Sequence, residues 1–125
     1  MKEEYLFKLS MMQQEAEKLQ EQIQLINRQL EEFEILKLSL DEIEDGKEFL
    51  ASLGKGIFVK SKIENKELFV NIGCGIVVRK KADETKEIID RQTKQLAEIK
   101  LRLLDEIEKI NFQLQELVEK AKKED

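Results

Sequence analysis

Apolar residues in the first third of the chain recur at alternating steps of three and four. Glu, Gln, Lys and Arg fill most of the positions between them. Such a heptad pattern predicts a long helix that packs against another helix through a narrow seam. The stripe, which only Lys37 interrupts, consists of Leu9, Met12, Ala16, Leu19, Ile23, Ile26, Leu30, Phe33, Lys37 and Leu40.

The last third of the chain repeats this spacing less regularly. Lys86, Thr93 and Lys100 weaken the first half of its stripe, and Ile99, Leu101 and Leu104 widen the apolar face there. The stripe comprises Ala82, Lys86, Ile89, Thr93, Leu96, Lys100, Leu103, Ile107, Ile110, Leu114, Leu117 and Ala121. Two arms of roughly 40 residues, about 60 Å each, joined by a short middle predict an antiparallel helical hairpin with both termini at the same tip.

The period changes to two in the middle of the chain. Ile57, Val59 and Ile63 alternate with Phe58, Lys60 and Lys62, and the segments 68–72 and 76–79 also contain β-branched and aromatic residues. This pattern is typical of strands. Glu48 to Leu53 is a further strand candidate, and turns are expected at 54–56, 65–66 and 73–75. The middle therefore predicts four short strands, or two β-hairpins.

Together these elements predict an α+β fold in one domain of residues 1–125. A long antiparallel coiled-coil helical hairpin, formed by 1–46 and 82–125, has two β-hairpins inserted at 47–81. A small sheet built from that middle has apolar side chains on both faces, whereas two helix ends can cover only one of them. We therefore expect the β region to assemble with other subunits in an oligomer.

The composition argues against catalysis. The 125 residues include no proline and no histidine, and Cys74 is the only cysteine. Without histidine the commonest metal ligand and neutral-pH base are missing. Gly73-Cys74-Gly75 begins like a dinucleotide-binding loop, but the third glycine of that motif would fall at Val78, so a turn is the better interpretation. We expect no enzyme activity, catalytic residue, cofactor or metal.

Charge is distributed in three blocks. Residues 1–45 carry five basic and twelve acidic side chains, 46–81 eight and three, and 82–125 nine and twelve. The basic middle could contact nucleic acid, but both of its flanks are acidic and would repel the phosphates. The better interpretation is that its lysines protect strand edges from aggregation. We therefore expect no nucleic-acid partner. The N-terminus has acids where a signal peptide needs bases, and no apolar run approaches about 20 residues. A cytoplasmic protein without a membrane partner is expected.

Apolar residues surround the first turns of the N-terminal helix, more than a two-helix seam can bury. Packing at a frayed end, or contact between tips, is one interpretation. The other is an exposed apolar patch whose methionine and aromatic side chains adapt to many partner shapes. The residues concerned are Tyr5, Leu6, Phe7, Leu9, Met11 and Met12, with Phe112, Leu114, Leu117 and Val118 near the opposite terminus.

Two segments of the middle block resemble the α-class subunits of the prefoldin family. They are Leu-Gly-Lys-Gly-Ile-Phe-Val-Lys at 53–60 and Val-Asn-Ile-Gly-Cys-Gly-Ile-Val-Val at 70–78, and two hairpins in place of one mark the α class. The likeness extends over nearly the whole chain. This chain has Ala51-Ser52 where family members often have a proline.

The resemblance implies an ATP-independent holdase. It implies a hexamer of two α-like and four β-like subunits, in which the β region assembles into a β-barrel body. This hexamer captures non-native proteins at its tips and passes them to a group II chaperonin. Client binding then falls to Tyr5, Leu6, Phe7, Leu9, Met11, Met12, Leu114, Leu117 and Val118. Subunit contact falls to Ile57, Phe58, Val59, Phe69, Val70, Ile72, Ile76, Val77 and Val78. The alternative function is a structural, self-assembling homo-oligomer or filament.

Overall fold

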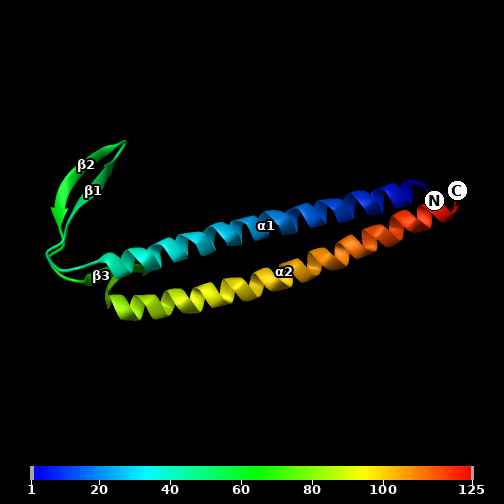
Figure 1. Ribbon diagram of the computed structural model, residues 1–125. Coiled ribbons are helices and arrows are strands. Elements are labelled where there is room, and N and C mark those ends of the chain that lie inside the picture. Colours follow the sequence, from blue (N-terminus) through cyan, green and yellow to red (C-terminus); the bar gives the residue numbers. More distant parts are fainter. Residues whose placement is uncertain (1, 125) are drawn as a thin grey trace. The chain divides into compact units, whose positions relative to one another are not determined.

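A computed structural model describes residues 2–124 of the chain. Helix α1 (Lys2–Glu42) leads into strands β1 (Glu48–Gly54), β2 (Ile57–Lys62), β3 (Glu67–Gly73) and β4 (Ile76–Lys81), and helix α2 (Ala82–Glu124) completes the order (Figure 1). This order confirms the predicted fold class of two long helices with two β-hairpins between them. Closure of the hairpins into a barrel needs further subunits and stays a prediction.

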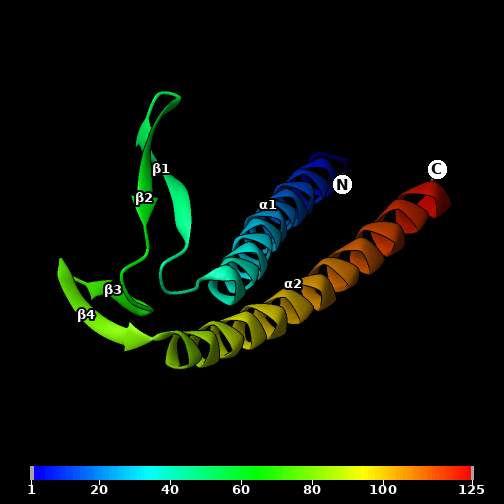
Figure 2. The same cartoon turned by 60° about the vertical axis from the view of Figure 1, so that its left-hand side comes forward.

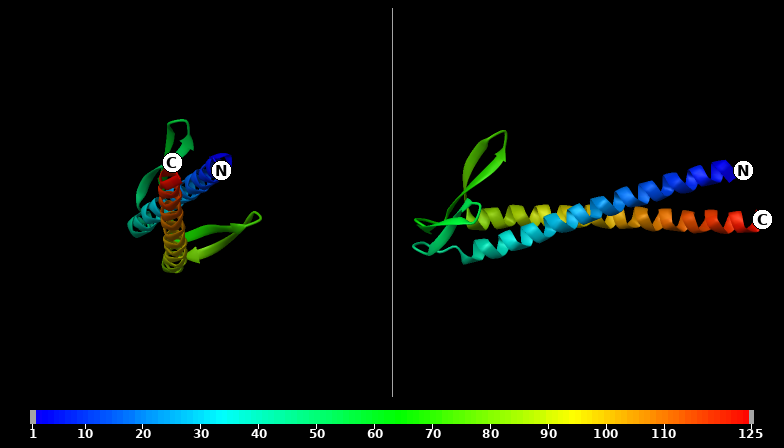
Figure 3. Two further views of the ribbon diagram at one scale, coloured as in Figure 1. Left: turned by 90° about the vertical axis from the view of Figure 1, so that its right-hand side faces the viewer. Right: turned by 90° about the horizontal axis from the view of Figure 1, so that it is seen from above.

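The chain divides into two compact units. The first joins α1 up to residue 31 with α2 from residue 93 onwards, and the second runs from residue 32 to 92. In the first unit the helices lie side by side and antiparallel, so their N- and C-terminal ends share one end of this unit (Figures 1 and 3). Its buried centre consists of Leu19, Ile107 and Ile110.

The burial pattern confirms the seam predicted from the heptads. Every stripe residue of the first unit is buried or half-buried, including the two polar members Thr93 and Lys100. Met12, Ala16, Ile23, Leu103 and Leu114 pack around the buried centre as partly buried neighbours. The seam is narrow because only the a and d positions of each helix face the other helix.

In the second unit the helices meet through a smaller seam that contains Leu40 and Ile89, both buried. Thr85, the other buried side chain here, donates its hydroxyl to the carbonyl of Lys81 at 3.0 Å, across the junction of β4 and α2. Asp83 and Glu84 follow in the first turn of α2, where the helix dipole favours negative charge.

The four strands form two separate ladders. β1 pairs only with β2 and β3 only with β4, both antiparallel (Figure 2). Lys55 and Gly56, with φ of 50° and 79°, form the two-residue turn of the first hairpin, and Cys74 and Gly75, with 51° and 73°, form that of the second. Two consecutive positive φ angles define a type I′ turn, whose twist matches that of the strands. The predicted glycine turns are thus confirmed.

Candidate functional site

The apolar residues at the free end of the first unit fall into two groups. Leu9, Met12, Leu114 and Leu117 occupy seam positions and are half-buried between the helices, and Tyr5 is half-buried as well. These five side chains are therefore largely committed to holding α1 and α2 together.

The second group is more exposed than the first. Leu6, Phe7 and Met11 are 54%, 67% and 53% exposed, and Val118 on α2 is 37% exposed. Phe112, 62% exposed on α2, belongs with them, although the resemblance did not assign it to client binding. Its sequence signal is a large aromatic residue two positions after the seam residue Ile110, which places it on the outer helix face. We call the exposed set Leu6, Phe7, Met11, Phe112 and Val118 the tip patch.

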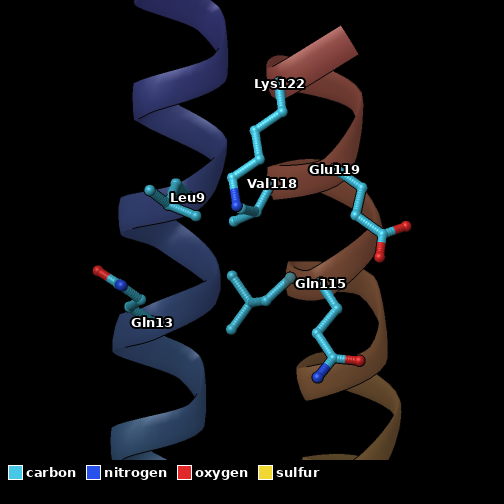
Figure 4. A pocket seen from close by; sticks show the side chains of 7 residues that line it. Leu9, Gln13, Gln115, Val118, Glu119 and Lys122 are labelled. Atoms are coloured by element: carbon cyan, nitrogen blue, oxygen red, sulfur yellow. The ribbon is translucent and has the colours of Figure 1, made fainter.

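A groove of about 430 Å³ lies between the helices at this end. Figure 4 shows Leu9 and Val118 pointing toward one another from the facing helices, while Gln115 and Glu119 lie toward the outer side of α2. The groove thus has an apolar floor and a polar rim. Its full lining is Leu9, Gln13, Leu114, Gln115, Val118, Glu119 and Lys122.

The described residues of the tip mainly offer apolar surface. No set of three or more His, Cys, Asp or Glu side chains among residues 2–123 is placed to hold a metal ion. Cys74, the lone thiol, is exposed in the turn between β3 and β4. Within the part of the chain that the structure describes, neither helix is both long and apolar enough to cross a membrane.

The hairpins form the second candidate site, and each has two chemically different faces. Cross-strand partners share a face, so the register places Ala51 with Val59 and Val70 with Val78. We call this the inner face, because apart from Ser61 and Lys80 its members are apolar. Six of the nine predicted assembly residues lie on it, namely Ile57, Val59, Val70, Ile72, Ile76 and Val78.

The other three predicted assembly residues, Phe58, Phe69 and Val77, lie on the opposite face. This outer face carries nearly all the strand charges. Lys60 Nζ lies 3.7 Å from Glu48 Oε2, and Arg79 lies 4.0 Å from the Glu67 carboxylate in the other hairpin. The Arg79 guanidinium also lies 5.7 Å from the centroid of the Phe69 ring, a cation–π contact.

The two hairpins repeat one sequence pattern and one pairing register. Residues 48–62 and 67–81 correspond position by position at a shift of nineteen, from Glu48 to Glu67 through to Lys62 and Lys81. The pairing register repeats, and so does the irregularity before each turn. Ser52 Oγ accepts a hydrogen bond from the amide of Gly54 at 3.3 Å, and Asn71 Oδ1 accepts one from that of Gly73 at 2.9 Å.

The sequence interpretation missed this repeat, although the shared Gly-x-Gly-Ile signal was visible in both segments. Most of the predicted assembly residues are exposed in the single chain, whereas Val70 and Val78 are half-buried. Because each hairpin has only two strands, nothing within its own ladder covers the inner face. Both hairpins therefore offer a similar apolar inner face, on which Ile57, Ile72 and Ile76 are exposed.

Comparisons with known proteins agree with this architecture. The family model described as "Prefoldin subunit" matches residues 12–124. The chain is 33% identical over 112 residues to a protein of Thermofilum pendens named "Prefoldin subunit alpha", covering 86% of this chain and 87% of that protein. It is similar in fold to a cryo-EM structure of filamentous PFD from Methanocaldococcus jannaschii, with a TM-score of 0.54, 21% identity and 93% of each chain covered.

Proposed function

Because the chain belongs to the prefoldin family and has the two β-hairpins that mark its α class, we propose that it is a holdase chaperone subunit. In this role it captures non-native proteins at the end of its helix pair without ATP and delivers them to a group II chaperonin. The observation that carries the proposal is the tip patch. Leu6, Phe7, Met11 and Phe112 are all more than half exposed, although half-buried residues beside them already close the seam.

The chemistry of the tip patch suits reversible capture. Apolar surface contributes about 25 cal/mol for each Å² removed from water, so a few large side chains provide useful but limited affinity. Methionine and aromatic side chains adapt to varied apolar partners. A non-native client exposes such surface along much of its length, and several weak contacts together retain it while each remains easy to break.

We further propose that the inner faces of both hairpins dock hairpins of β-class prefoldin subunits in an α2β4 hexamer. The support is their lack of charge apart from Lys80, together with the exposure of Ile57, Ile72 and Ile76 in the single chain. Strands that pair only once also leave edges that a neighbouring strand can satisfy. The proposal places the protein in the cytoplasm and includes neither a nucleic acid nor a membrane as a partner.

The test is suppression of aggregation of a denatured protein, followed by light scattering, with the chain reconstituted with β-class subunits. The tip variant carries Leu6→Ser, Phe7→Ser, Met11→Ser and Phe112→Ser. The matched control carries four serines at other exposed positions of the same unit, namely Leu25, Ile99, Leu101 and Leu104.

We expect the tip variant to lose most of its protection while the mass of the complex stays unchanged, and the control to protect as the unmodified chain does. Equal protection by the tip variant would refute capture at this patch. Loss of protection in both variants would show that apolar surface anywhere on the helices suffices, which also contradicts the proposal.

A second candidate function is a structural one, in which the chain assembles with itself into a homo-oligomer or filament. The unpaired outer edges of all four strands favour this alternative. The mass of the purified chain discriminates between the two functions. Large assemblies from this chain alone support the structural role, whereas a small species that grows only with a β-class partner supports the chaperone role.

A further inference from the structure

Helix α1 has an apolar pair on its outer face within the second unit. Ile35 and Leu38 are 63% and 61% exposed, whereas the seam of this unit is formed by Leu40 and Ile89. Residues three apart on a helix are neighbours on its surface, so the two side chains form one patch. The contacts between α1 and α2 do not explain it.

Carboxylates surround this pair. Glu31 lies one turn before Ile35 and Glu42 one turn after Leu38, with Glu32 on the same side, and all three are exposed. Among the ion pairs that the structure describes for the side chains of residues 2–123, none uses these three carboxylates. We call the set Glu31, Glu32, Ile35, Leu38 and Glu42 the acidic helix face.

The outer face of the β1–β2 hairpin has the complementary composition. Leu50 and Phe58 are 66% and 56% exposed and lie on this face with Lys60 and Lys62. Leu50 pairs with Lys60, and Phe58 follows on the same face one step nearer the turn. Glu48 lies on the same face, 3.7 Å from Lys60, so the face presents an apolar pair beside two lysines and one carboxylate. The acidic helix face presents an apolar pair between carboxylates, so the two surfaces have opposite net charge.

We propose that the acidic helix face docks the outer face of the β1–β2 hairpin of a second copy of this chain. Every copy carries both surfaces, so a two-fold dimer forms the contact twice. The attraction between lysines and carboxylates adds to the burial of Ile35, Leu38, Leu50 and Phe58. This surface is separate from the inner faces and from the tip patch.

The β3–β4 hairpin is the poorer partner, although the repeat gives it a similar outer face. There Arg79 already stacks over the ring of Phe69 and pairs with Glu67. Its guanidinium and the aromatic surface beneath it are thus partly used within the hairpin. Glu48 pairs with Lys60 in the first hairpin as Glu67 does with Arg79 in the second, so the cation–π contact is what distinguishes the two hairpins. No such contact covers Phe58 or Leu50, which makes the first hairpin the docking element and makes the second hairpin a matched control.

The test measures the mass of the purified chain alone by light scattering, at low and at high salt. We expect a mass near twice 14.7 kDa at low salt and a shift toward the monomer at high salt, because screening weakens the exposed charge pairs. Ile35→Asp with Leu38→Asp, and separately Lys60→Glu with Lys62→Glu, give monomers. Leu25→Asp, and separately Arg79→Glu with Lys81→Glu, stay dimeric.

A mixing experiment then identifies the partner. A chain with Glu31→Lys and Glu42→Lys and a chain with Lys60→Glu and Lys62→Glu are each monomeric, and their mixture regains the dimer, because each supplies the charge that the other has lost. A wild-type chain that is monomeric at low salt refutes the proposal, as does a mixture that stays monomeric. The serine variant of the tip patch must dimerise like the wild type, so failure of client capture leaves this result unchanged.

Discussion

The Nζ atom of Lys37 lies 2.8 Å from Oδ1 of Asp90, which joins the end of α1 to the start of α2 within the second unit. Lys37 occupies a stripe position that every other member of the α1 stripe fills with an apolar residue. A second pair repeats the arrangement in reverse, since the stripe residue Lys86 of α2 reaches Asp41 of α1. The antiparallel alignment near the hairpins thus combines a small apolar seam with two reciprocal ion pairs.

The Lys37 pair predicts a loss of stability at high pH. The hydrogen bond to Asp90, followed by the charges of Asp90 and Asp41, raises the pKa of Lys37 above its ordinary value, and desolvation opposes this only in part. A pKa that is raised in the folded state stabilises the protein at pH values below the unfolded-state pKa. This stabilisation is lost as the pH rises through the folded-state pKa. We expect the wild type to lose part of its unfolding free energy above about pH 10.4 relative to Lys37→Gln. Denaturant titrations of both proteins at mildly and strongly alkaline pH measure the difference, and parallel losses would contradict the prediction.

Two adjacent substitutions separate the apolar seam from the ion pair. Ile89 is only 4% exposed, so Ile89→Ala removes buried methyl groups and is expected to cost about 2–4 kcal/mol of unfolding free energy. Asp90→Ala breaks a contact whose side chains are 48% and 58% exposed, and solvent screens such a pair, so its effect should be measurable but clearly smaller than that of Ile89→Ala. Urea unfolding followed by circular dichroism compares the two. An Asp90→Ala effect as large as that of Ile89→Ala would mean that the ion pair dominates this seam.

The turns predict opposite effects of two neighbouring substitutions. Gly75 has a φ of 73° and no atom near the position of an added Cβ, so Gly75→Ala meets only the backbone cost of the left-handed region, roughly 1–2 kcal/mol. Cys74, with a φ of 51°, also occupies this region, and Cys74→Asn creates the Asn-Gly pair that type I′ turns favour. Hydrogen exchange of the β3–β4 amides should quicken in the first variant and slow in the second. The same direction of change in both would argue against a turn-controlled hairpin.

The repeat of nineteen residues predicts that the two hairpins contribute similarly to assembly. Val59→Asp and Val78→Asp place a carboxylate at equivalent positions of the two inner faces, and each should reduce the amount of β-class subunit bound to a similar extent. Ser52→Asp and Asn71→Asp are the controls, because they place the carboxylate on the outer face and keep an acceptor for the Gly54 or Gly73 amide. Mass measurement of the reconstituted complexes gives the comparison. If only one inner-face variant is impaired, the hairpins are not equivalent.

Much of the fold could be predicted from the chain because its signals are local and periodic. The two stripes lie on the observed seam, and the strands and both glycine turns occur where alternation and Gly-x-Gly placed them. The role of Lys37 could not be predicted from the sequence. A lysine in an apolar stripe looks like a defect, because the partner that explains it, Asp90, lies 53 residues away along the chain.

The candidate sites were likewise predictable only in part, because some of their features depend on contacts between distant segments. Composition identified an excess of apolar residues near the tip, but it could not separate Leu9, which half-buries against α2, from Phe7, which stays exposed, since that depends on where the second helix lies. The spacing of Phe112 from Ile110 already indicated an outward position, and the structure shows that no neighbouring segment covers it, since it is 62% exposed. On the hairpins, alternation alone distinguished two faces, and the cross-strand register then showed that the charges gather on one of them.

The sequence by itself determined the helices, the strands, the turns and the absence of histidine and proline, because each of these follows from composition or from spacing within a few residues. Only the tertiary structure decided which apolar side chains are buried in the seam between the helices and which remain exposed. It also decided that Lys37 meets Asp90 and that Arg79 covers Phe69. These outcomes depend on contacts between segments, and a single chain's periodicity contains no information about the distance between two such segments.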